Sequence, residues 1–62
     1  MAYIVVWTTG SSEADRRDFY SVHETFARAL KEYDVRVAED DLYCAAITQV
    51  VGATEPHWME VR

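Results

Sequence analysis

Residues 12–33, SEADRRDFYSVHETFARALKEY, decide the fold, because their secondary structure determines how two strongly apolar segments, one before and one after them, are connected. Apolar side chains recur here at spacings of three and four: Phe19, Val22, Phe26, Leu30 and Tyr33. This spacing is typical of a helix with one apolar face. Ser12 precedes Asp15 by three residues, and we interpret the pair as a capping box at the helix N-terminus. The stretch therefore predicts a helix that lies on a sheet.

The flanking segments predict strands. Residues 2–9, AYIVVWTT, form a continuous apolar run without polar alternation, which is typical of a strand that is covered on both faces. Residues 42–51, LYCAAITQVV, predict a second strand. An acidic connection at 34–41 precedes it and a turn at 52–56 follows it. The tail, 57–62, predicts a short third strand or a hairpin arm.

The order strand, helix, strand predicts an α/β fold in which a β-α-β unit has parallel strands and a right-handed crossover. The whole chain, 1–62, is expected to be a single domain. A chain this short buries only about 60% of the surface that its unfolded form exposes. One cysteine, Cys44, allows no internal disulfide, and with His23 and His57 it is too little for a zinc site. We therefore expect self-association by sheet pairing, edge to edge or face to face, and neither a metal nor a cofactor.

Charge and hydropathy exclude two kinds of partner. The net charge of −5 argues against nucleic acid, which calls for a basic face. No apolar stretch approaches the roughly 18 residues of a membrane span. We expect a cytoplasmic protein.

Three segments resemble the 4-oxalocrotonate tautomerase family. They are AYIVVW at 2–7, VAEDDLY at 37–43 with AITQV at 46–50, and the pair His57-Trp58. The subunit of that family is a β-α-β unit, and two subunits pair into a four-stranded sheet. The resemblance implies a hexamer built as a trimer of dimers, or a hetero-hexamer with a related chain.

The resemblance also implies a chemistry. Family members use an amino-terminal proline, exposed when the initiator methionine is removed, as the general base of a keto-enol tautomerisation. Arginines hold the carboxylates of a small α-keto acid or enol, an aromatic side chain walls the pocket, and no cofactor takes part. The matching positions here are Ala2 for the proline, Ser11 for one arginine, Tyr43 or Cys44 for the other, and Trp58 for the aromatic.

The resemblance places the reacting amine on Ala2 if Met1 is removed, and one residue earlier if Met1 is kept. A free α-amine ordinarily has a pKa of about 7.7–8.0, and an apolar surround lowers it toward a neutral base. His57 lies beside Trp58 and joins Ser11, Tyr43 and Cys44 as a candidate contact for a small carboxylate ligand.

Three functions stay open. The first is a divergent tautomerase that works through its N-terminal amine. The second is a non-catalytic structural or ligand-binding subunit of the same fold, which the loss of the proline and of both arginines favours. The third is a small dimeric α/β module with a ligand that the sequence does not name.

Overall fold

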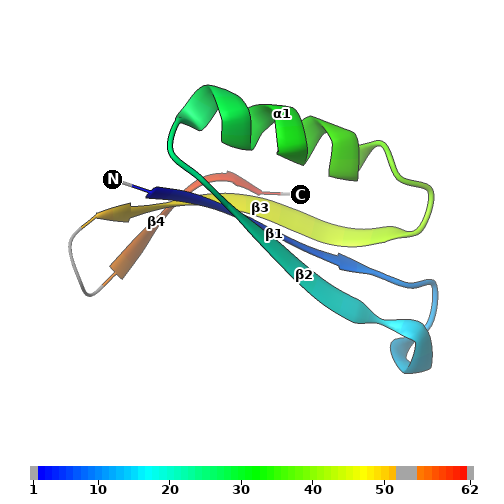
Figure 1. The fold of residues 1–62 in the computed structure, drawn as a ribbon. Helices are drawn as coiled ribbons and strands as arrows, with labels where there is room; N and C mark the ends of the chain where they lie inside the picture. Colours follow the sequence, from blue (N-terminus) through cyan, green and yellow to red (C-terminus); the bar gives the residue numbers. More distant parts are fainter. Residues whose placement is uncertain (1, 52–54, 62) are drawn as a thin grey trace.

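The structure, a computed structural model, describes residues 2–51 and 55–61, and side chains for residues 2–50, Met59 and Val61. The described chain forms one sheet with one α-helix lying across it (Figure 1). Its elements in chain order are β1 (Ala2–Thr9), the 3₁₀ turn η1 (Glu13–Asp15), β2 (Arg17–His23), α1 (Phe26–Val37), β3 (Leu42–Val51) and β4 (Glu55–Val61).

The sheet has the strand order β2-β1-β3-β4, and every neighbouring pair is antiparallel. The predicted parallel β-α-β unit is therefore wrong. β2 and β3 both run antiparallel to β1, so they share one direction and α1 connects two strands that point the same way. They are not neighbours because β1 lies between them.

The predicted helix is wrong in its first half. Arg17–His23 pairs with β1 along its whole length as β2. In a strand Phe19 and Val22 point to opposite faces, so their spacing of three does not mark one apolar stripe. The helix starts at Phe26, where the hydroxyl of Thr25 accepts a hydrogen bond of 3.3 Å from the backbone N–H of Arg28.

The other predicted elements are confirmed within a few residues. β1 and β3 match 2–9 and 42–51. Helix α1 continues to Val37, inside the predicted acidic connection. The tail forms β4, which pairs with β3 and begins at Glu55, inside the predicted turn.

The core lies between α1 and one face of the sheet. Its buried side chains come from β1, α1 and β3: Val5, Trp7, Ala29, Tyr33, Ala45 and Ile47. Partly buried side chains surround them: Tyr3, Phe26, Leu30, Val37 and Leu42. We call this side of the sheet the helix face.

Arg36 closes the core at the end of α1. Its guanidinium lies 4.4 Å from the centre of the Trp7 ring and forms ion pairs of 2.7 Å with Glu39 and 2.9 Å with Glu32. Hydrogen bonds to Glu39 and then to Glu32 raise the pKa of Arg36 above its ordinary value. The Arg36 side chain is therefore bound to Glu32 within α1, to Glu39 just after the helix, and to the Trp7 ring.

Gly10 makes the turn that leaves β1. Its φ of +119° is a conformation that side-chain-bearing residues rarely adopt. A Cβ at this position would lie 2.6 Å from the carbonyl oxygen of Asp15 and 2.8 Å from backbone atoms of Arg16. The N–H of Gly10 also donates a 2.8 Å hydrogen bond to the carbonyl of Asp41, which ties this turn to the loop before β3.

We therefore predict that Gly10→Ala lowers the free energy of unfolding by about 2–3 kcal/mol, because it adds both backbone strain and a clash. Urea unfolding followed by tryptophan fluorescence at one fixed protein concentration measures the change. Ser11→Ala, at the exposed next residue, is the control and should leave stability nearly unchanged. Equal stability of the two variants would contradict the assignment of this turn.

The hydroxyl of Tyr33 is buried and has no hydrogen-bond partner among the described residues, whereas the hydroxyl of Tyr3 accepts a 3.2 Å hydrogen bond from the side chain of Gln49. An unsatisfied buried hydroxyl costs free energy. We predict that Tyr33→Phe leaves stability unchanged or raises it by about 1 kcal/mol, and that Tyr3→Phe lowers it by about 1 kcal/mol. Urea unfolding of both variants gives the comparison, and a loss at Tyr33 larger than at Tyr3 would contradict it.

Candidate functional site

The second face of the sheet, which we call the open face, carries no helix in Figure 1. Val5 and Trp7 point into the core, so alternation along β1 turns Ile4, Val6 and Thr8 to the other side. The strand registers extend this face over all four strands. Its described side chains are Ala2, Ile4, Val6, Thr8, Asp18, Tyr20, Val22, Cys44, Ala46, Thr48, Val50 and Val61.

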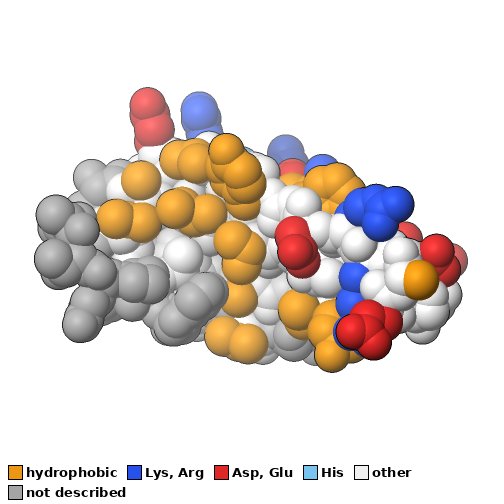
Figure 2. Space-filling model, turned by 90° about the horizontal axis from the view of Figure 1, so that it is seen from below, with side chains coloured by type: hydrophobic (Ala, Val, Ile, Leu, Met, Phe, Trp, Pro, Cys, Tyr) orange, Lys and Arg blue, Asp and Glu red, His pale blue; other side chains and the backbone are white. Residues whose placement is uncertain are grey.

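The open face is apolar and nearly without charge. Figure 2 shows hydrophobic side chains gathered across it, with most of the charged side chains toward its margins. Asp18 is the charged residue among the described side chains of this face. Three apolar residues are strongly exposed, with accessible fractions of 72% for Tyr20, 59% for Val22 and 68% for Val61. Monomeric proteins rarely leave a continuous apolar surface of this kind uncovered.

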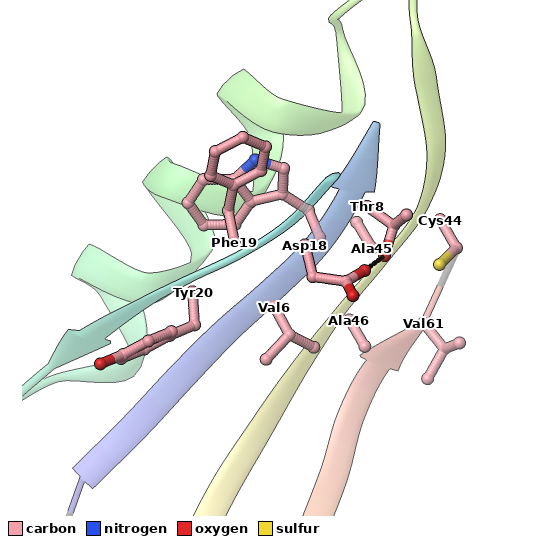
Figure 3. A pocket seen from close by; sticks show the side chains of 10 residues that line it. Val6, Thr8, Asp18, Phe19, Tyr20, Cys44, Ala45, Ala46 and Val61 are labelled. Carbon is pink, nitrogen blue, oxygen red and sulfur yellow. Dashed lines mark hydrogen bonds between the residues drawn. The ribbon is translucent and has the colours of Figure 1, made fainter. Parts of the chain in front are cut away.

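A broad groove of about 640 Å³ runs across this face. All four strands contribute to its lining, with Asp18 on β2, Val6 on β1, Ala46 on β3 and Val61 on β4 (Figure 3). Tyr20 and Cys44 lie at its sides. Apolar contact is therefore what most of the groove offers to a ligand or a partner.

One polar pair sits in the groove. The hydroxyl of Thr8 donates a 2.6 Å hydrogen bond to one carboxylate oxygen of Asp18, directly across the β1–β2 ladder (Figure 3). Cys44 is the partner of Thr8 on the other side, in β3. Among the described residues that line the groove there is no histidine, lysine or arginine. This described lining holds a carboxylate, a hydroxyl and a thiol, and it does not place beside the thiol the base that activates a cysteine nucleophile.

An aromatic–cation contact lies at one end of β3. The guanidinium of Arg16 stands 3.7 Å above the ring of Tyr43, and Tyr43 is the extra residue where the register of β1 and β3 shifts. Such contacts hold exposed side chains in place with modest energy, on the order of 0.5–1 kcal/mol. The ring face of Tyr43 is therefore occupied by a residue of its own chain.

The structure places the residues predicted from the tautomerase resemblance in two groups within one copy. Ala2 lies opposite Val50 at one end of β1. Cys44 and Tyr43 lie at the other end, near Thr8 and Thr9, and the exposed Ser11 follows beyond them. Because β1 spans Ala2–Thr9, the two groups are roughly 24 Å apart. One copy does not bring Ala2 together with Ser11, Tyr43 and Cys44.

His57 and Trp58 belong to β4, where their backbones pair with Gln49 and Thr48, toward the Ala2 end of the sheet. Their side chains lie outside the described residues, and so does Met1. Whether these residues contribute to a carboxylate site stays a prediction.

The sequence interpretation missed Thr8, Asp18 and Tyr20. The predicted helix included Asp18 and Tyr20. The position of Asp18 opposite Thr8 depends on the pairing of β2 with β1, which that prediction lacked. The available signal was short, because apolar and polar residues alternate only over Tyr20-Ser21-Val22-His23.

Comparisons with protein-family models, with curated proteins and with solved structures found no match to this chain. Across the described residues, no three His, Cys, Asp or Glu side chains gather as a metal-binding group. No helix in the described part of the chain is long and apolar enough to cross a membrane.

Proposed function

We propose that the chain is a non-catalytic assembly module whose open face packs against the open face of a second copy. One observation carries the proposal. β1 is apolar on both sides, yet α1 covers only the side that holds Val5 and Trp7. A strand at the centre of a sheet with apolar side chains on both faces is typical of a sheet that is covered on both faces. A second copy supplies the missing layer.

The size of the chain supports this arrangement. The described core has few large side chains, of which only Ile47 and Val5 are fully buried. Small domains of this kind gain stability from disulfides, metals or oligomerisation. The chain extends over 35 × 23 × 15 Å, so its broad face offers at most roughly 800 Å², which is the area that each partner contributes to a standard stable interface.

The distribution of charge favours the same face. Two copies that each carry a net charge of −5 repel one another, and the repulsion is smallest where few charges meet. The open face brings Asp18 to the contact, with one carboxylate oxygen already bound by Thr8. Two sheets packed in this way lie about 10 Å apart, with interdigitated side chains.

We predict that Val6→Lys, near the centre of the open face, weakens self-association by about 100-fold or more, because it buries an unpaired ammonium group at the interface. Val61→Lys on β4 should act in the same direction and, being 68% exposed, should leave the fold of one copy intact. Val35→Lys is the matched control, because Val35 is 53% exposed on α1, away from the sheet. Sedimentation velocity across the micromolar range measures association, and circular dichroism checks folding.

Two results would contradict the proposal. One is a wild-type chain that sediments as a monomer throughout the concentration range. The other is a folded Val6→Lys variant that associates as strongly as Val35→Lys. A hexamer or hetero-hexamer, with a small carboxylate as ligand, stays a prediction that rests on the tautomerase resemblance.

The catalytic alternative has its own test. If the chain is non-catalytic, an ultraviolet assay with a 2-hydroxymuconate-type enol should show no tautomerisation above the rate in buffer. Intact mass shows whether Met1 is kept, and Ala2→Pro restores the secondary amine that the family uses. Wild-type turnover that disappears when the N-terminal amine is acetylated would contradict the proposal and favour a divergent tautomerase.

A further inference from the structure

A second surface, independent of the open face, lies along the outer side of β2. β2 is the first strand in the order β2-β1-β3-β4, and no strand of the described chain pairs with its outer side. Half of the backbone N–H and C=O groups of an edge strand point away from its single neighbour. Such groups are a template for pairing with another strand.

The two edges of the sheet differ in how they are protected. β4 carries Pro56 and a register shift where it pairs with β3, and both features discourage strand addition. β2 has neither. Its register with β1 runs without interruption from His23, opposite Tyr3, to Arg17, opposite Thr9. Its central residues, 19–22, are uncharged.

The side chains of β2 are exposed on both faces. Phe19, on the helix face, stacks on Trp7 with a centroid distance of 5.6 Å but remains 45% exposed, because α1 packs mainly over β1 and β3. Tyr20 and Val22, on the open face, are 72% and 59% exposed. An edge strand with an uninterrupted register and exposed apolar residues on both faces is suited to strand pairing.

We propose that β2 pairs antiparallel with β2 of a second copy about a twofold axis at Tyr20, which joins two sheets into one of eight strands. This register pairs all seven residues of β2. Phe19 then lies opposite the partner's Ser21, Asp18 opposite the partner's Val22, and Tyr20 opposite the partner's Tyr20. No two carboxylates face one another, and the apolar open face continues from one sheet into the next.

A second copy fits this edge because the strand is complementary to itself. Two residues that lie opposite each other in a twofold antiparallel pair must project from the same face of the sheet. The register about Tyr20 meets this condition, because it pairs even-numbered residues with even-numbered residues and odd-numbered residues with odd-numbered residues. The central aromatic pair and the Phe19–Ser21 pairs add side-chain contacts of the kind that stabilise a ladder. The edge contact joins the backbones of two β2 strands within one sheet, whereas the open-face contact stacks two sheets. Each can therefore form without the other, although Tyr20 contributes to both.

Cross-linking tests the register. In a Cys44→Ser background, Phe19→Cys and Ser21→Cys chains are purified separately, then mixed and oxidised. Directly opposite residues have Cβ atoms about 4.5–5.5 Å apart, close to disulfide geometry. We expect a disulfide-linked heterodimer as the main product of the mixture and only traces in either chain alone. Phe19 and Ser21 lie on the helix face, so packing of open faces cannot bring them together.

Hydrogen exchange of the wild-type chain gives a second measurement. Backbone amides of β2 that point away from β1 should exchange slowly in the associated protein and quickly after dilution to the monomer. A mixture that cross-links no more than the separate chains, together with fast exchange of these amides in the associated protein, overturns the proposal. Cross-linking that persists with Val6→Lys added separates this edge contact from the open-face contact, because Val6 lies away from the edge.

Discussion

The position of β1 between β2 and β3 is the constraint on which the rest of the structure depends. Because β1 is central, its odd-numbered side chains must enter the core beneath α1, and its even-numbered side chains must form the middle of the open face. Moving the register by one residue would exchange Val5 and Trp7 for Val6 and Thr8 under the helix. The turn at Gly10 returns the chain as β2, and its hydrogen bond to Asp41 ties that turn to the start of β3.

The same constraint explains why α1 packs against one face of the sheet and leaves the other face without a helix in Figure 1. One helix covers about one face of a small sheet, and the described core consists of side chains from β1, α1 and β3. Among the described residues of the open face, Tyr20, Val22 and Val61 remain largely exposed, whereas Ala46 and Thr48 are buried. The self-association that we propose would cover the exposed side chains without assigning them any chemistry. It also accounts for the uneven placement of charge in an acidic chain, since the repelling groups lie mainly at the margins (Figure 2).

The described residues of the groove on the open face do not form a set of catalytic groups. Enzyme sites bring a nucleophile or a base together with groups that orient it. Here Thr8 donates a hydrogen bond to Asp18, and Cys44 adjoins Thr8, with no basic side chain among the groove residues that the structure describes. The positions that the tautomerase resemblance assigned to chemistry are spread along the length of β1 instead of converging within one copy. The surface of a protein–protein contact requires apolar area and few charges, and the described part of the open face has both.

Local pattern alone determined the strands at 2–9 and 42–51 and the C-terminal part of the helix. Each of these follows from periodicity or composition over neighbouring residues. Only the tertiary structure decided that Arg17–His23 is a strand, because its pairing with β1 outweighs a helical spacing shared by a few apolar residues. That pairing also set the strand order, brought Asp18 to Thr8, and left β2 at an edge. Contacts between residues distant in the sequence depend on which strands become neighbours, and periodicity carries no information about that choice.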